Sequence, residues 1–383
     1  MKKLLISAGL LCVSVAPMFG AYNDGGSCTP RACPQPCPPK PCPPCPPSCN
    51  PAGVINDCMP KVITPAAGPR VCCGVDVAIT ASFIYWTART DGLGYAVSGY
   101  RSNADVNPGK GEVKHIDWDF HPGFKVGLGL GLGHDGWDIM AEYTWLYTST
   151  DSDSTSQANL NESTLRPLWY PGGPNNVSPS TAITSARASY DIDLNVIDLE
   201  LGRNFFVSRY LKIRPHFGLK GAWYDADYSV RYILDSDEAV EPNAYRTRFD
   251  HDYWGVGIRT GFDTAWHFTR SFSIVGEIAL SGLWGQFDAD RRDTDFNSNS
   301  SDIETRVLLN TENQFHTLKP IMELFLGMRY DTWFCDEDFH FSLEAGWEEQ
   351  IWWNHNQYFR VYEEGSHGDL VFQGLTLKAR FDF

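Results

Sequence analysis

From about residue 73 to its last residue, the chain repeats segments in which apolar and polar positions alternate. In the first of them, Val77, Ile79 and Phe83 share one phase, and small or polar residues occupy the other. A period of two places successive side chains on opposite faces of a β-strand. The pattern therefore predicts a series of strands, each with one apolar face and one polar face.

Ten segments carry this alternation, which favours an even-numbered, closed sheet. Where the phase slips, at Val196 and Ile197, we expect a β-bulge. Segments 228–234 and 303–309 are expected either to lengthen strands or to add new ones, so twelve to sixteen strands remain possible. The ten segments are 75–85, 120–132, 137–147, 188–205, 211–220, 252–268, 272–281, 318–330, 339–347 and 371–383.

The connections between these segments alternate between short and long. Short turns are predicted near 133–136, 206–209, 269–270 and 331–337, and long polar loops near 89–118, 150–187, 235–250, 288–313 and 354–368. Short turns at one end and long loops at the other are typical of outer-membrane barrels, with the short turns in the periplasm. The predicted fold is all-β: a closed antiparallel transmembrane β-barrel of about ten strands.

Aromatic residues support this prediction by their positions. They make up 14% of the chain, yet the mean hydropathy is only −0.30, so they are dispersed among polar residues. Many fall at the predicted strand ends, as in Tyr85-Trp86, Trp223-Tyr224 and Trp352-Trp353. Such positions are typical of the aromatic girdles at the two membrane surfaces.

The first 20 residues predict a secretory signal peptide. Lys2 and Lys3 precede an apolar stretch from 4 to 15, and small residues follow near position 20. Beyond residue 20 the sequence has no run of about 18 apolar residues, so no membrane-spanning helix is expected. We therefore divide the chain into a signal peptide (1–20), a Cys/Pro-rich periplasmic segment (21–72) and the barrel (73–383).

The Cys/Pro-rich segment cannot form a helix or a central strand, because proline lacks the amide N–H and fixes φ. In an exported protein its thiols favour disulfides, within the chain or with other envelope proteins. Metal binding, redox activity at Cys42-Pro-Pro-Cys45 and a plain tether are the alternatives. The disulfide candidates are Cys28, Cys33, Cys37, Cys42, Cys45, Cys49, Cys58, Cys72, Cys73 and Cys335.

Charge and motifs exclude several classes of function. The net charge of −16 makes a nucleic-acid partner a poor match, because such proteins present a basic surface. We expect no cofactor and no metal. Glycines 127, 129, 131 and 133 alternate along a predicted strand, and no helix follows that could complete a nucleotide site.

The polar faces of the strands carry charges of both signs, which would line the lumen of a barrel. Such a lining suits a diffusion pore for small hydrophilic solutes. The alternative is a plugged, structural barrel in which the charges neutralise each other. The pore-lining candidates are Lys125, Glu142, Arg203, Lys212, Arg214, Lys220, Arg259, Glu277, Lys319, Glu323, Arg329, Glu344, Lys378 and Arg380.

A third hypothesis is a barrel enzyme, since ten strands also suit outer-membrane proteases. His115 with Asp117 and His251 with Asp252 are the local candidates for acid–base chemistry. Neither pair has a readable nucleophile or partner base, so a catalytic function is not expected.

The chain resembles the major-outer-membrane-protein-like family of chlamydia-related bacteria and of Legionella. The resemblance is carried by "VDVAITASFIYWTARTDGLGYA" at 75–96, "HPGFKVGLGLGLGHDGWDIMAEYTWLYT" at 121–148 and "DLNVIDLELGRNFFVSRYLKIRPHFGLKGAW" at 193–223. It implies a porin in outer-membrane lipid that is cross-linked by disulfides to itself or to other Cys-rich envelope proteins. The terminal "GLTLKARFDF", with Phe381 and Phe383, is similar to the signal that barrel-assembly machinery recognises.

Overall fold

The computed structural model describes residues 76–99, 111–132, 136–155, 165–170, 182–234, 243–296, 304–334, 339–359 and 366–383. All of them belong to one compact unit, Cys45–Phe383. The predicted signal peptide, the Cys/Pro-rich segment and every cysteine named above lie outside the described residues. Within the described ranges, no helix is long and apolar enough to cross a membrane.

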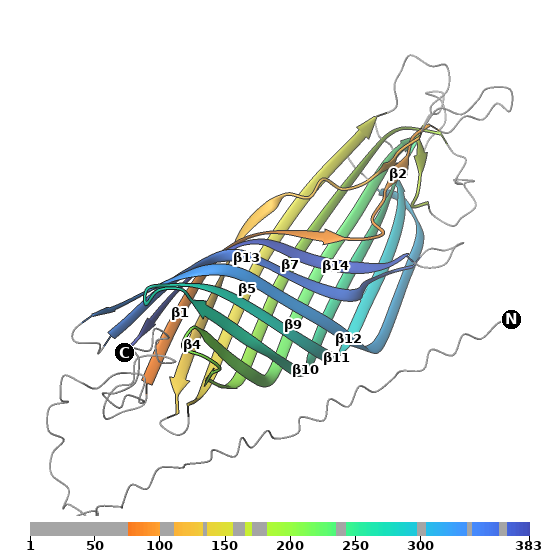
Figure 1. Cartoon of the computed structure of the whole chain (residues 1–383). Helices are drawn as coiled ribbons and strands as arrows, with labels where there is room; N and C mark the ends of the chain where they lie inside the picture. Colours follow the sequence, from red (N-terminus) through yellow and green to blue (C-terminus); the bar gives the residue numbers. More distant parts are fainter. Residues whose placement is uncertain are drawn as a thin grey trace, which may run out of the picture. The chain divides into compact units, whose positions relative to one another are not determined.

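Ten long antiparallel strands form a closed barrel, as the alternation predicted (Figure 1). Each long strand pairs with the long strands before and after it, and β1 pairs with β14 from Ala78↔Asp382 to Thr90↔Leu370, which closes the sheet. The strands are β1 (Asp76–Thr90), β4 (Phe120–Gly131), β5 (Trp137–Thr155), β7 (Ile183–Arg203), β9 (Leu211–Leu234), β10 (Ala244–His267), β11 (Phe272–Phe296), β12 (Glu304–Phe334), β13 (Phe339–Tyr358) and β14 (Ser366–Asp382).

Several strands are longer than predicted, and the loops between them are shorter. The predicted loops 235–250 and 288–313 were wrong in extent, because β10 already begins at Ala244 and β11 continues to Phe296. Likewise, 228–234 and most of 303–309 lengthen β9 and β12 and add no strand. These polar stretches remain strands because their inward residues still pack, as the buried Ala289, Arg291 and Asp293 do.

We call the two ends of the barrel by their connections. The short-turn end carries the C-terminus and the links β4–β5, β7–β9, β10–β11 and β12–β13, with a short strand β8 (Phe205–Phe206) between β7 and β9. The long-loop end carries the other links. There β2 (Ala96–Val97), β3 (Val113–Lys114) and β6 (Arg166–Pro167) form a small separate sheet.

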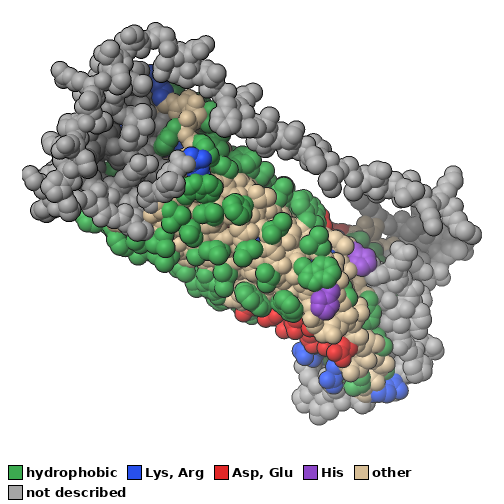
Figure 2. Space-filling view, turned by 90° about the horizontal axis from the view of Figure 1, so that it is seen from below, with side chains coloured by type: hydrophobic (Ala, Val, Ile, Leu, Met, Phe, Trp, Pro, Cys, Tyr) green, Lys and Arg blue, Asp and Glu red, His purple; other side chains and the backbone are tan. Residues whose placement is uncertain are grey.

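The outer wall near the short-turn end is an apolar belt. Leu219, Ile258, Leu280 and Leu326 are among its exposed aliphatic residues, and Figure 2 shows such hydrophobic side chains spread across the wall. Exposed aromatic residues border the belt on both sides. They are Tyr85, Trp223, Trp254, Trp284 and Trp347 toward the long loops, and Trp266, Phe272, Tyr330, Phe339 and Phe381 toward the short turns. This arrangement matches a lipid-facing wall with two aromatic girdles.

Above the belt, toward the long loops, the polarity of the two faces is exchanged. On β9, Trp223 is exposed and Lys220 is buried within the belt, whereas Asp225 is exposed and Tyr228 is buried beyond it. The same exchange occurs on β7, where Val196 is buried inside and Ile197 is exposed outside. The β-bulge predicted there was wrong: β7 pairs with β5 and β9 without interruption through this point. The apparent slip in phase marks the level at which the apolar face changes from the interior to the exterior.

The alternating glycines of β4 face the lumen and bring β4 close to its neighbour. A Cβ at Gly127 would lie 2.4 Å from the Thr80 hydroxyl, and one at Gly129 would lie 3.1 Å from the Ala78 methyl group. These positions therefore accommodate the inward side chains of β1.

Candidate functional site in the barrel lumen

A network of ion pairs crosses the lumen at the level of the apolar belt. Lys220 of β9 is only 1% exposed, and its ammonium lies 2.8 Å from Asp198 of β7 and 2.6 Å from Glu323 of β12. The inward positions of three different strands therefore meet at one lysine. A buried charge is tolerated when it is paired and hydrogen-bonded in this way.

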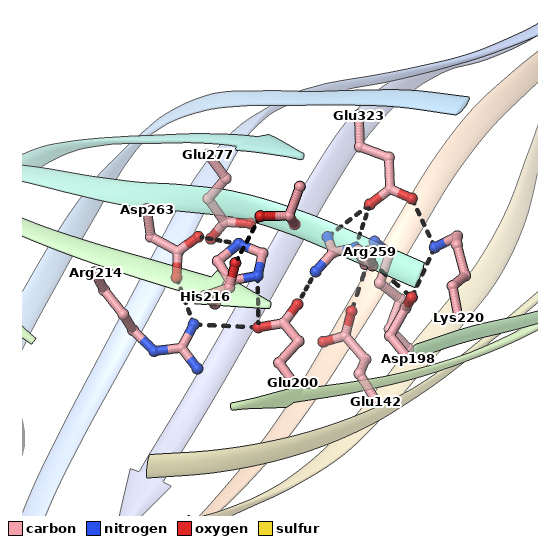
Figure 3. Close-up of polar contacts among 12 residues, drawn as sticks. Glu142, Asp198, Glu200, Arg214, His216, Lys220, Arg259, Asp263, Glu277 and Glu323 are labelled. Atoms are coloured by element: carbon pink, nitrogen blue, oxygen red, sulfur yellow. Dashed lines mark hydrogen bonds and ion pairs between the residues drawn. The ribbon is translucent and has the colours of Figure 1, made fainter. Parts of the chain in front are cut away.

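Two arginines extend this network along the barrel, as Figure 3 shows. Arg259 of β10 lies 2.6 Å from Glu323 and also contacts Glu200. Arg214 of β9 lies 3.1 Å from Glu200 and 2.7 Å from Asp263. Since Glu200 accepts from both arginines, the two halves of the network are connected through one carboxylate.

A second network lies on β1, β4, β13 and β14. The Lys125 ammonium lies 2.6 Å from Glu348 and 5.0 Å from the centroid of the Trp86 ring. Glu348 also accepts from the Thr376 hydroxyl at 3.0 Å, and that hydroxyl accepts from the Trp86 indole N–H at 3.1 Å. These four side chains therefore form one connected network across this part of the interior.

A cavity of about 140 Å³ lies in the short-turn part of the lumen. A cavity of this size has room for several water molecules. Its wall carries seven basic and ten acidic side chains and extends from His340, Asp331 and Asp382 to Glu348 and Gln350. The cavity is thus polar, and none of the aromatic residues of the long-loop half lines it.

The long-loop half of the interior is filled by aromatic side chains. Trp169, which follows β6, is 1% exposed, and its ring centroid lies 4.9 Å from that of Phe249 and 5.9 Å from that of Tyr228. Its indole N–H donates to the Gly94 carbonyl at 3.0 Å. We call this group the aromatic cluster; its further members include Tyr95, Tyr190, Tyr224, Tyr232, Tyr253, Phe287, Trp352 and Tyr358.

Polar contacts hold the connecting segments inside the barrel. The buried Arg291 guanidinium lies 3.0 Å from Asp293 and donates to the carbonyls of Phe359 at 3.1 Å and Tyr170 at 3.0 Å. The Tyr228 hydroxyl donates to the Leu93 carbonyl at 3.2 Å. The segments around Leu93, Tyr170 and Phe359 are thereby fixed to the inner wall at the long-loop end.

The structure places most of the predicted pore-lining residues on the wall of the cavity. Lys220 lies beside the cavity in the ion-pair network. Lys319 lies in the long-loop half, 5.0 Å above the Phe287 ring, and contacts the Asn354 carbonyl. The residues that line the cavity are Lys125, Glu142, Lys212, Arg214, Arg259, Glu277, Glu323, Arg329, Glu344, Lys378 and Arg380.

Arg203 has a different position. It shares the outward phase of Leu199 and Leu201, and its guanidinium lies 5.8 Å from the centroid of the Trp137 ring and 4.7 Å from that of the Phe205 ring. An arginine at this border can contact aromatic rings and water together, which charge alone did not indicate. The sequence prediction also omitted Asp263 and Glu348, although they share the phase of Arg259 and Glu344, which it included. It omitted Asp198 and Glu200 because it chose the opposite phase of β7, that of Arg203.

The histidine–aspartate pairs do not form catalytic dyads. His251 is buried in the aromatic cluster, whereas the adjacent Asp252 is exposed on the outer face of β10. Burial, and to a lesser degree the charge of Lys319, lower the pKa of His251 to about 3. His115 and Asp117 are both exposed. Among the described residues, no group of His, Cys, Asp and Glu is arranged to hold a metal ion.

Comparisons with known proteins give one family. The model of the Legionella pneumophila major outer membrane protein precursor matches residues 71–383. No curated protein matches the chain.

Three solved structures illustrate the structural likeness. The outer membrane protease OmpT from Escherichia coli has 12% identity and a TM-score of 0.40, covering 80% of this chain and 96% of that chain. A major outer membrane protein from Thermus thermophilus has 10% identity and a TM-score of 0.25, covering 81% and 99%. A Pseudomonas aeruginosa FadL homologue has 6% identity and a TM-score of 0.23, covering 81% and 90%. At these values the three structures carry no argument about what this chain does.

Proposed function

We propose that this chain, which belongs to the Legionella major outer membrane protein family, is a structural protein of the outer membrane. In this proposal the lumen of the barrel is blocked to solutes. Family and fold both support its location in that membrane. The observation that carries the proposal is the aromatic cluster, whose rings are almost fully buried in the long-loop half of the lumen. Barrels of about eight to ten strands commonly fill their interior with side chains in this way.

Envelope cross-linking is the second part of the proposal. Ten cysteines follow the predicted signal peptide, and nine of them precede β1. Short turns and the C-terminus lie at the same end as the start of β1, which is the arrangement expected if the Cys/Pro-rich segment enters the periplasm. In that oxidising compartment the thiols would join copies of the chain, or the chain and other envelope proteins.

A diffusion pore is the second candidate function, and the polar cavity favours it. The cavity is lined by charges of both signs, which is typical of a path for small hydrophilic solutes. For solutes to pass, the segments that carry Trp169 and Tyr358 would have to leave the interior. A pore would then be a state in which the long-loop end has opened.

Single-channel recording in planar bilayers separates the two candidates. We expect refolded wild-type protein to be silent, and a Trp169→Ala/Phe249→Ala double variant to show open steps. Trp223→Ala/Trp254→Ala, which changes two outward residues, is the matched control and should stay silent. Folding is checked by circular dichroism and by heat-modifiable gel mobility. Stable open steps from the wild-type protein would show that the lumen is not blocked and would establish the pore.

Native envelopes test the cross-linking. Without reductant, the protein should migrate as disulfide-linked oligomers, and reductant should convert them to the monomer. A monomer band of equal intensity in both gels would remove cross-linking from the proposal.

A further inference from the structure

Lys212 is a basic residue of the cavity wall, and no described residue forms an ion pair with it. It lies on the inward face of β9, and the described residues provide it with neither a salt bridge nor a hydrogen bond. Each of the other six basic side chains that line the cavity forms at least one ion pair. Lys212 therefore differs from every other cation of this wall.

Arg329, Arg380 and Arg214 are the cations that act on Lys212, and Asp138 acts on it in the opposite sense. Acids at this end of the cavity are already engaged: Glu344 lies 2.7 Å from Arg329, and Asp382 lies 2.6 Å from Arg380. An ammonium with no partner in such surroundings is destabilising, and a bound anion would offset this effect.

His267 supplies a second, independent indication. It is 1% exposed and lines the same cavity, yet neither ring nitrogen has a hydrogen-bond partner within the described part of the chain. Lys212 pairs in register with Ala265, so His267 is its diagonal neighbour on the inward face of β10. Diagonal positions of adjacent strands are close enough for long side chains to reach one ligand. The nearby Asp331 is engaged with His340 at 3.0 Å.

We propose that the short-turn end of the lumen binds a small oxyanion between the Lys212 ammonium and a ring N–H of His267. Although acids outnumber bases along the cavity as a whole, Glu344 and Asp382 are paired with Arg329 and Arg380, and Asp331 contacts His340. The cavity of about 140 Å³ has room for a phosphate-sized anion and several waters. A tetrahedral oxyanion, with several acceptor oxygens, can satisfy both donors at once.

Inorganic phosphate titrated into the full-length protein in detergent micelles, at low ionic strength, tests the site by calorimetry. Lys212→Gln should weaken binding by about tenfold or more, since a hydrogen bond to a charged group contributes roughly that much. His267→Asn should weaken it less, and Lys212→Arg should retain it. Lys114→Gln, which removes an exposed lysine outside the cavity, is the control and should bind as the wild type does.

Two results would overturn the site: no saturable phosphate binding by folded wild-type protein, or equal affinities for wild type and Lys212→Gln. If Lys212→Gln does not fold, the comparison of His267→Asn with wild type decides the question. The outcome is separate from conductance, because a closed barrel and an open pore can both hold an anion at this end.

Discussion

Asp227 of β9 and Asp250 of β10 lie directly opposite each other on the outer face of the barrel. Their neighbours continue the arrangement, since Asp227 also faces Asp191, and Asp250 also faces Asp290. A second row, Asp193, Asp225, Asp252 and Asp288, runs beside the first. Like charges in cross-strand pairs are destabilising. Eight aspartates therefore repel one another immediately beyond the apolar belt.

Asp250→Asn should stabilise the barrel at neutral pH, by about 0.5 kcal/mol on the scale of cross-strand pairs. Burial, together with Asp227, raises the pKa of Asp250 from 3.8 to about 6. A carboxyl group with a raised folded pKa destabilises the fold once it is ionised, so its penalty grows from pH 4 to 6 and is complete above that. Urea unfolding at pH 7.5 should show the gain, and at pH 3.5 the variant and wild type should converge.

Asp153→Asn is the matched control. Asp153 lies 3.6 Å from the oppositely charged Arg187, so this substitution removes an attraction and should not stabilise the barrel. Added salt should also stabilise the wild type more than Asp250→Asn, since it screens exposed charges. An Asp250→Asn variant that is less stable than the wild type at pH 7.5 would contradict the repulsion.

Lys220→Met should destabilise the barrel by about 3 kcal/mol, because it leaves Asp198 and Glu323 with one buried cation fewer. Changing Asp198 to Asn in the same protein should recover part of the loss. Denaturant unfolding of the two single variants and the double variant measures this coupling. Lys114→Met, at an exposed pair 2.6 Å apart, should change stability by less than about 1 kcal/mol. Additive effects of Lys220→Met and Asp198→Asn would mean that the network is not a unit.

Gly257→Ala should lower the free energy of unfolding by roughly 1–3 kcal/mol, the range for overpacking in a close-packed interior. A Cβ at Gly257 would lie 1.9 Å from the Gly282 carbonyl oxygen, so backbone would have to move. At Gly221 the nearest atom is 3.6 Å away, on the Trp223 ring, and alanine should be tolerated there. The yield of heat-modifiable, folded protein compares the two variants. Equal yields would show that β10 and β11 can separate without penalty.

Acid should weaken the aromatic cluster through its buried histidines. Burial and Lys319 lower the pKa of His251 to about 3, and burial and His251 lower that of His355 well below 6.5. Depressed histidine pKa values stabilise the fold fully above about 6.5, and this contribution is lost as the pH falls below that value. The urea midpoint of the wild type should therefore fall between pH 7 and 5.

A His251→Phe/His355→Phe variant should show a smaller fall over the same range. His251 already stacks on the Phe287 ring, with the ring centroids 5.1 Å apart, so a phenyl ring suits its site. The reference variant is His316→Phe, which changes a histidine outside the cluster. A fall as steep as that of the wild type would show that other groups cause the acid sensitivity.

The sequence was sufficient to predict the barrel, because each of the ten segments is long and carries its apolar residues on one face of the strand. The pore-lining candidates included all seven basic side chains of the cavity wall and four of its ten acidic ones, since charges on one strand face must avoid lipid. The prediction failed where the two faces exchange polarity, at Val196 and Ile197 on β7. Alternation of apolar and polar residues shows that the two faces of a strand differ, but it does not show which face points into the lumen. For the same reason, the strand beyond Asp288 was taken for a loop. The aromatic cluster could not be predicted, because it depends on segments around Leu93 and Trp169 that return into the interior.

The aspartate rows also fix how deeply the protein is immersed. Row members Asp225 and Asp252 lie only two residues beyond Trp223 and Trp254, a distance of about 7 Å along a strand. If the barrel moved by that distance toward the short-turn side of the membrane, the four carboxylates of the second row would enter the hydrocarbon. If it moved the opposite way, the aromatic girdle near the short turns would leave the membrane surface. The same aspartates that destabilise the fold by repulsion therefore limit how deeply the barrel can lie in the membrane.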